Sequence, residues 1–222
     1  MNSSTCVKLC CHQKMPVTSL FVEKSTPLQE IQTARTGGCR HFHFALGSEA
    51  QISTMLVEPL ERDDFFLTLH IDTRLPAIRG LMDIDLMLLE GKEVATYLMM
   101  EKWQEAGYTH SIGVAYYTIP ELNALLGSAH KIPSVNLVSA SSLTEELIEY
   151  CQANKIALMV QGQDGVENRE VQRIALMKRR QPEVIYLRYL LQRGIAVTTR
   201  HSACLQLFDF TLSAEEMRWI QT

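Results

Sequence analysis

Two histidines and a glutamate could form a metal site at the ends of three successive strands. His43, His70 and Glu90 each lie at or just after the end of a short apolar segment that is expected to be a strand. Neighbouring strands lie about 4.8 Å apart, so these side chains would form one patch. Two imidazoles with one carboxylate are typical of a metal centre. His41 would share the strand face of His43. The alternative is that polar residues stand at strand ends without binding a metal.

The cysteines give no comparable signal. The chain has six, at positions 6, 10, 11, 39, 151 and 204, and their spacing fits no zinc finger. The number and spacing of the cysteines favour a reducing compartment. No helix that could activate a thiol is expected near Cys10 and Cys11, so we interpret them as bystanders.

The segments that carry these residues alternate between strand and helix patterns. Helical patterns separate eight strand-like runs, at 17–22, 40–44, 65–71, 83–89, 110–115, 134–139, 156–160 and 194–199. Eight strands alternating with helices predict a (β/α)8 TIM barrel with short loops. A doubly wound sheet is the alternative, but it normally stops at five or six strands. We expect one domain over residues 15–222 and a disordered tail over residues 1–14.

Composition excludes several classes of protein. Of the 222 residues, 46% are hydrophobic and 21% are charged, which is typical of a globular chain. The net charge of −4 gives no field that would attract nucleic acid or anionic lipid. The longest apolar run is far shorter than the roughly 20 residues that span a bilayer. We therefore expect neither a nucleic-acid nor a membrane partner. The compartment is expected to be the cytoplasm, with the mitochondrion as the alternative because the first residues are weakly basic.

Several motifs follow one another in the order found in a known family. They are Met15-Pro-Val, Arg40-His41, Gly47-Ser-Glu49, Asp85-Leu86, Ile112-Gly-Val114, Val135-Asn136, residues 188–194 and residues 205–210. On these residues the chain resembles the aldo-keto reductases from Met15 to Ile220. The resemblance implies a (β/α)8 barrel. It also implies hydride transfer from a nicotinamide cofactor to a carbonyl, with a tyrosine as proton donor.

The catalytic positions implied by the resemblance hold other residues. In the family, an aspartate, a lysine and a histidine assist the tyrosine. His43 replaces the aspartate, Leu46 the tyrosine, His70 the lysine and Glu90 the histidine. A leucine side chain has no acidic hydrogen, so Leu46 cannot protonate a carbonyl oxygen. The family's proton donor is therefore missing from its usual position.

The cofactor positions implied by the resemblance are also changed. Ala115 and Tyr116 replace a serine-asparagine pair, Leu137 replaces a glutamine, and Gln161 replaces the tyrosine that stacks on nicotinamide. Only Arg200 stands where a phosphate-binding lysine is expected. These changes predict that no cofactor binds, with NADP as the alternative.

Three interpretations follow. The main one is a catalytically inactive, pseudoenzyme-like protein that acts as a binding or structural subunit of a larger complex and has protein partners. A precedent is the regulatory subunit of glutamate-cysteine ligase, to which Val135-Asn136-Leu137 and Ser139 are similar. The second is an NADP-dependent reductase with an atypical site, in which Tyr116 or Tyr117 supplies the proton. The third is a barrel with a His43, His70 and Glu90 metal site.

Overall fold

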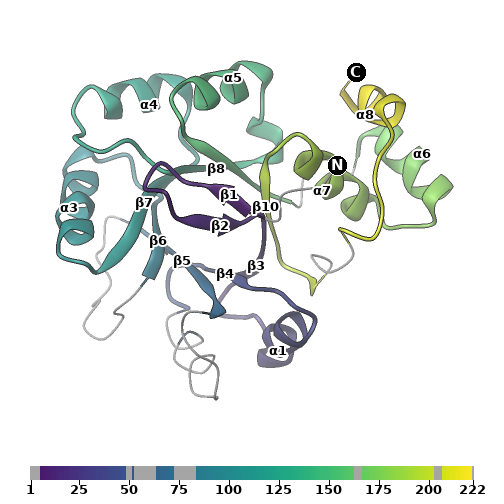
Figure 1. Cartoon of the computed structure of the whole chain (residues 1–222), viewed down its shortest axis with the longest axis horizontal. Helices are drawn as coiled ribbons and strands as arrows, with labels where there is room; N and C mark the ends of the chain where they lie inside the picture. Colours follow the sequence, from purple (N-terminus) through teal and green to yellow (C-terminus); the bar gives the residue numbers. More distant parts are fainter. Residues whose placement is uncertain are drawn as a thin grey trace.

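Eight parallel strands close into a barrel in the computed structural model, which describes residues 6–48, 52, 64–72, 84–162, 167–202 and 207–221. The strands follow the order β10-β3-β4-β5-β6-β7-β8-β9 around the barrel (Figure 1). Their bounds are β3 Thr18–Val22, β4 His41–Phe44, β5 Phe66–Ile71, β6 Ile84–Leu89, β7 Thr109–Ala115, β8 Val135–Ser139, β9 Ala157–Gln161 and β10 Ala196–Thr199. The predicted (β/α)8 barrel is confirmed.

Helices lie around the outside of the barrel (Figure 1). They are α1 Leu28–Thr36, α3 Val94–Glu105, α4 Ile119–Leu126, α5 Glu145–Ala153, α6 Arg169–Lys178, α7 Pro182–Gln192 and α8 Ala214–Gln221, with a short 3-10 helix at Ala140–Ser142. The helical pattern between the strand-like runs 65–71 and 83–89, a short one at residues 73–80, lies outside the described residues. The sequence indicates no bounds for helix α3, because Met99 on it is exposed while Glu101 is buried, which obscures an apolar stripe.

Local sequence signals fix where some helices begin. At α4, Thr118 and Glu121 form a capping box in which each side chain binds the other residue's backbone N–H. At α5, the Thr144 hydroxyl accepts a hydrogen bond from the Leu147 N–H. Both threonines follow a barrel strand closely, so each helix begins near the carboxyl end of the sheet.

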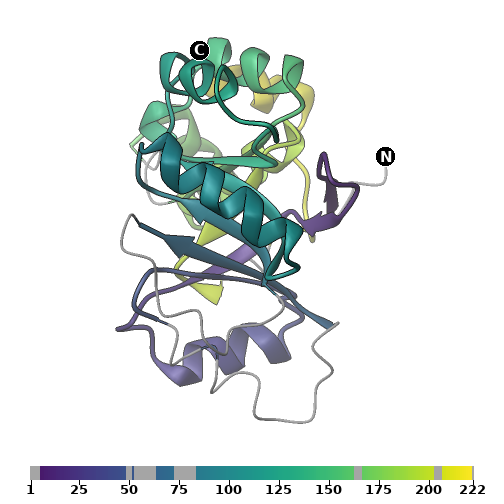
Figure 2. The ribbon, with the colours of Figure 1, turned by 90° about the vertical axis from the view of Figure 1, so that its left-hand side faces the viewer.

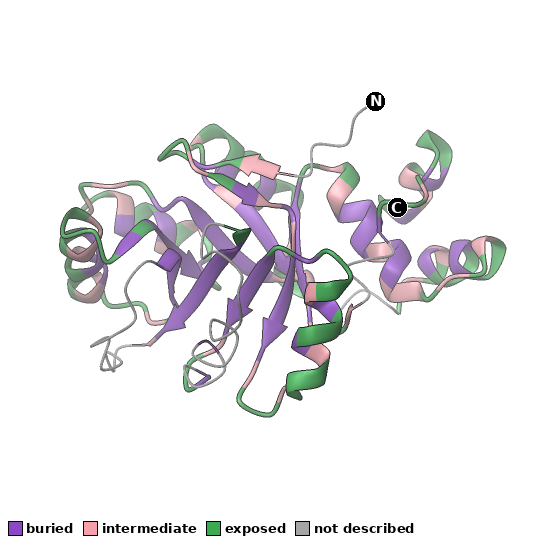
Figure 3. Cartoon of the chain, turned by 60° about the horizontal axis from the view of Figure 1, so that its bottom comes forward, coloured by how far each residue is buried: buried purple, intermediate pink, exposed green. Residues whose placement is uncertain are grey.

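The core has two layers, one inside the barrel and one between the strands and the helices. Leu86, Leu88, Leu137 and Met159 belong to the inner cluster and are fully buried. The strands are buried along most of their length, whereas the outer faces of the helices are exposed (Figure 3). Apolar residues on both faces of a strand are the pattern expected of parallel strands covered on both sides.

Gly113 on β7 marks a close approach between strands. A Cβ atom added there would lie 2.6 Å from the Val135 carbonyl oxygen and 2.7 Å from Leu88 Cδ2. We expect Gly113→Ala to lower the free energy of unfolding by about 1–3 kcal/mol, because the barrel must shift to admit the methyl group. Urea unfolding measures this loss. Gly127→Ala is the control, since its nearest atoms would lie at an ordinary 3.5 Å, and an equal loss in both variants would contradict the steric explanation.

The N-terminal segment forms a hairpin against the barrel, which differs from the tail expected over residues 1–14. Strands β1 (Cys6–Lys8) and β2 (Lys14–Pro16) pair antiparallel, with Cys6 opposite Pro16. Leu9 and Met15 are buried in the inner cluster. Figure 2 shows the hairpin at one end of the barrel. Three-residue strands are too short for their alternation to stand out in the sequence.

No helix in the described ranges is both long and apolar enough to cross a membrane.

Candidate functional site

A polar cluster occupies the barrel at the carboxyl ends of β4, β5 and β6. His43 and His70 lie with their ring centroids 4.7 Å apart, and His70 Nδ1 lies 3.4 Å from Glu90 Oε2. The parallel register explains this, because His43 pairs with Thr68 and His70 pairs with Leu88. The predicted proximity of the three side chains is therefore observed.

The two histidines are buried, but Glu90 reaches solvent. His43 is 0% exposed and His70 is 3% exposed, whereas the Glu90 side chain is 52% exposed. Within the described ranges, neither ring nitrogen of His43 nor His70 Nε2 has a hydrogen-bond partner. Buried polar atoms normally have partners, so this cluster retains unused hydrogen-bonding capacity.

Burial and mutual repulsion set the charges in this cluster. Burial holds the pKa of His43 well below its usual value, and the nearby His70 and His41 lower it further. The hydrogen bond from His70 lowers the pKa of Glu90. His43 is therefore neutral and Glu90 is ionised at neutral pH.

The metal alternative is not supported by this geometry. Among the residues that the structure describes, no three histidine, cysteine, aspartate or glutamate side chains are grouped so that they could hold a metal ion. The Phe21 ring packs edge-on against both His43 and His70, with centroid distances of 5.0 and 6.1 Å. An aromatic ring thus occupies part of the space beside the two imidazoles.

Tyr116 extends from the end of β7 across the barrel opening toward β9. Its hydroxyl donates a 2.8 Å hydrogen bond to Gln161 Oε1, and its ring centroid lies 6.4 Å from that of His70. The backbone φ of Tyr116 is 61°, in the left-handed region that side chains with a Cβ seldom adopt. Lys92 Nζ donates a hydrogen bond to the Tyr116 carbonyl oxygen, which stabilises this conformation. Backbone strain of this kind concentrates at functional sites.

The hydroxyl of Tyr116 is protonated at neutral pH. Burial raises the pKa of Tyr116, the charge of Glu90 raises it further, and the charge of Arg200 lowers it. The side chain nevertheless remains 36% exposed. Tyr117 is different, because it is 3% exposed and donates its hydroxyl to the Gly91 carbonyl oxygen.

The expected cofactor positions divide into apolar and polar groups. Ala115 and Leu137 are fully buried and offer no polar side chain. Arg200 Nη2 lies 2.7 Å from Glu23 Oε1, and its guanidinium lies over the Phe21 ring. Leu46, at the position of the family's proton-donating tyrosine, is exposed, and its side chain offers no acidic hydrogen.

Sequence reasoning missed two residues of this region. Lys92 supports Tyr116 from the loop after β6, and its ammonium also pairs with Glu121 at 3.0 Å. Thr198 on β10 is buried beside Gln161, and its Oγ1 has no partner in the described part of the chain. A lysine in a loop and a threonine in a strand are common, so neither gave a signal.

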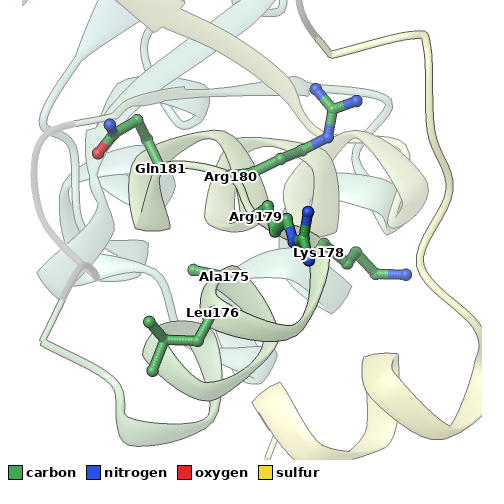
Figure 4. A pocket seen from close by; sticks show the side chains of 6 residues that line it. All are labelled: Ala175, Leu176, Lys178, Arg179, Arg180 and Gln181. Carbon is green, nitrogen blue, oxygen red and sulfur yellow. The ribbon is translucent and has the colours of Figure 1, made fainter.

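A separate cavity lies outside the barrel, between α6 and α7. Its volume is about 590 Å³, and Figure 4 shows the residues that line it: Ala175, Leu176, Lys178, Arg179, Arg180 and Gln181. Two of its cations are neutralised within the chain, since Lys178 pairs with Glu216 and Arg180 pairs with Asp209. None of the lining residues belongs to the polar cluster of the barrel, so we take the barrel mouth as the candidate site.

The curated proteins that the chain resembles are named as reductases. No family model matches the chain. It is 33% identical over 141 residues, 55% of its length, to a (1S)-1,7-diacetoxy-luvungin A aldo-keto reductase of Citrus sinensis, of which the match spans 44%. It is 25% identical over 262 aligned residues to NADPH-dependent codeinone reductase 1-5 of Papaver somniferum, covering 90% of this chain and 82% of that protein.

Solved structures give the same result. An aldo-keto reductase from a Medee basin deep-sea metagenome library superposes with a TM-score of 0.86 and 26% identity, over 97% of this chain and 93% of the other. An aldo/keto reductase from Brucella melitensis gives a TM-score of 0.87 at 22% identity over 97% of both chains, which supports the fold. The relatives and the structural neighbours that the chain resembles are thus named as reductases, most of them as aldo-keto reductases.

These relatives correct the main sequence-based interpretation. The expected inactive subunit without a cofactor is contradicted, because the similar proteins are named as reductases and several as NADPH-dependent ones. They favour the alternative, a reductase with an atypical site. The likeness to the glutamate-cysteine ligase regulatory subunit receives no support. The main interpretation gave the changed catalytic and cofactor positions more weight than the overall resemblance to reductases.

Proposed function

We propose that the chain is an NADP(H)-dependent reductase of carbonyl compounds in which Tyr116 is the proton donor. The observation that carries this proposal is the strained, partly exposed tyrosine at the carboxyl end of a barrel strand, where barrel enzymes build their active sites. The NADPH dependence named for the similar codeinone reductases supports the choice of cofactor.

Tyr116 can deliver a proton to a substrate oxygen at the mouth. In the free protein its O–H points to Gln161 Oε1. Rotation about the C–O bond would direct the same hydrogen to a carbonyl oxygen. Transfer of that proton, as a hydride reaches the carbonyl carbon, would leave the Tyr116 oxygen negatively charged. Arg200 opposes the effect of Glu90 and favours that anion. Because the side chain reaches solvent, water can restore the proton after turnover.

The carboxyl ends of β9 and β10 offer groups suited to the cofactor. These are the seventh and eighth barrel strands, after which barrels often bind phosphate. Arg200 would bind a phosphate in place of Glu23, and Gln161 Nε2 would donate to the nicotinamide amide. The Thr198 hydroxyl has no hydrogen-bond partner among the described residues, and Thr198 pairs with Gln161 across the two strands. This hydroxyl therefore suits a polar ligand. When bound, NADPH supplies the hydride that reduces the carbonyl carbon.

Cofactor binding and turnover can be tested separately. We expect NADPH to raise the melting temperature in proportion to the logarithm of its concentration above Kd, since it binds the folded state alone. We also expect oxidation of NADPH, followed by its absorbance, when aldehydes and ketones are added. No thermal shift at millimolar NADPH, or a shift without turnover across a broad carbonyl panel, would refute the proposed reductase.

A variant of the phosphate position sharpens the test. Arg200→Met removes the cation but keeps an unbranched apolar side chain, so we expect weaker NADPH binding. Arg193→Met is the matched control, because Arg193 pairs with Glu145 outside the barrel. Equal effects of the two substitutions on the NADPH Kd would show that Arg200 has no specific role.

A further inference from the structure

The N-terminal hairpin carries two adjacent exposed thiols that hold it to the barrel. Cys10 Sγ lies 3.1 Å from Ser134 Oγ, and Cys11 Sγ lies 2.9 Å from Ser111 Oγ. Ser134 immediately precedes β8, whereas Ser111 lies near the start of β7. Each thiol therefore contacts a different part of the barrel, at the end opposite the proposed active site.

The direction of the second hydrogen bond follows from its neighbours. The Ser111 hydroxyl donates its single hydrogen to Gln13 Oε1 at 2.7 Å. Cys11 must therefore donate its S–H to Ser111 Oγ. Gln13 continues the chain of contacts, because its Nε2 donates to Asp85 Oδ1, and Asp85 Oδ2 accepts from the Leu67 N–H. The Cys11 thiol is thus the exposed end of a hydrogen-bond network that reaches β5.

We propose that Cys10 and Cys11 form a site of reversible S-thiolation by small disulfides such as oxidised glutathione, and that this modification loosens the hairpin. In each step, a cysteine thiol loses its proton to water, and the resulting thiolate attacks one sulfur of the small disulfide. A protein–small-molecule disulfide forms, the original S–S bond breaks, and the other half leaves as a thiolate. The product sulfur has no hydrogen, so the S–H donor is lost and a bulky group takes its place.

Geometry disfavours a bridge between the two cysteines. Adjacent Cα atoms are about 3.8 Å apart across a trans peptide, and the described residues contain no cis peptide bond. Disulfides usually need Cα atoms about 4.4–6.8 Å apart. The two thiols also contact different serines. Mixed disulfides are therefore the expected products.

Other cysteines provide an internal comparison. Cys39 and Cys151 are buried at 4% and 0% exposure. Burial also raises the pKa of the Cys151 thiol to about 11. A small disulfide should therefore modify neither of them while the protein is folded.

The experiment treats the folded full chain with oxidised glutathione in a Cys204→Ser background, which removes the cysteine outside the described residues. Peptide mapping should place adducts on Cys10 and Cys11 and none on Cys39 or Cys151. Trypsin should then cut after Lys8 and Lys14 about tenfold faster, which corresponds to about 1.4 kcal/mol of local opening. Dithiothreitol should reverse both effects.

The control is the double variant Cys10→Ser and Cys11→Ser, which keeps hydroxyl donors but cannot be thiolated. We expect its trypsin cleavage to be unaffected by oxidised glutathione. The proposal is overturned if Cys39 or Cys151 reacts as fast as Cys10 and Cys11, or if the mass falls by two hydrogens instead of rising by adducts. Unchanged cleavage of the fully modified protein would likewise overturn it.

Discussion

Tyr116→Phe is expected to lower kcat for carbonyl reduction by about 10²- to 10⁴-fold, the usual contribution of a general acid. The substitution removes the hydroxyl that donates to Gln161 but keeps the ring that packs near His70. NADPH affinity should therefore change little. Steady-state kinetics together with a fluorescence titration of NADPH separates the two quantities.

Tyr150→Phe is a matched control for this experiment. The Tyr150 hydroxyl also donates a hydrogen bond, to Asn123 Oδ1 at 2.7 Å, but it links α5 to α4 outside the barrel. Its loss should leave kcat unchanged. If Tyr116→Phe retained full activity while Tyr117→Phe lost it, the proton donor would be Tyr117, and the reductase itself would stand.

The fold should lose stability in mild acid because its interior histidines resist protonation. His41 is 0% exposed, with Nδ1 3.0 Å from the Pro16 carbonyl oxygen and Nε2 2.8 Å from Thr68 Oγ1. Burial lowers its pKa from 6.5 to about 4. Between these values the unfolded chain binds a proton that the native protein does not, so stability is complete above pH 6.5 and falls toward pH 4. His41 alone accounts for a loss of about 2 kcal/mol by pH 5 and about 3 kcal/mol by pH 4.

Urea unfolding at a series of pH values between 7 and 5 measures this effect. Carboxylates such as Glu90, whose pKa is lowered in the fold, lose their contribution only below about pH 4.5, so they do not interfere. His43 should add to the loss in the same direction. His41→Gln keeps hydrogen-bonding capacity without a titratable ring, and its stability should depend less on pH. A flat profile for the unaltered protein would contradict the explanation.

Much of the fold could be predicted because its signals are local and repeated. Each barrel strand is a short apolar run, and the order of these runs led directly to eight parallel strands. The proximity of His43, His70 and Glu90 also followed, since parallel strands bring their carboxyl ends together. The hairpin over residues 6–16 was missed, and helix α3 was given no bounds, because their burial depends on distant partners.

The chemistry of the site was harder to predict than its position. The link from Tyr116 to Gln161 crosses from β7 to β9, and the support from Lys92 comes from a third segment. Only the closed barrel brings these groups together, so no spacing in the sequence could indicate them. The left-handed backbone at Tyr116 is likewise set by tertiary contacts.

The separate anchoring of the hairpin suggests how this scaffold could be re-engineered. Gln13 donates to Asp85, and Asp85 accepts from the Leu67 N–H, so these two side chains fasten the hairpin at the end of the barrel opposite the proposed active site. Substitutions at the barrel mouth that change substrate choice should have effects on the free energy of unfolding that add to those of stabilising changes at the hairpin end. Distant sites without shared partners are energetically independent. A designer could first stabilise the hairpin end of the barrel and then vary the residues of the barrel mouth.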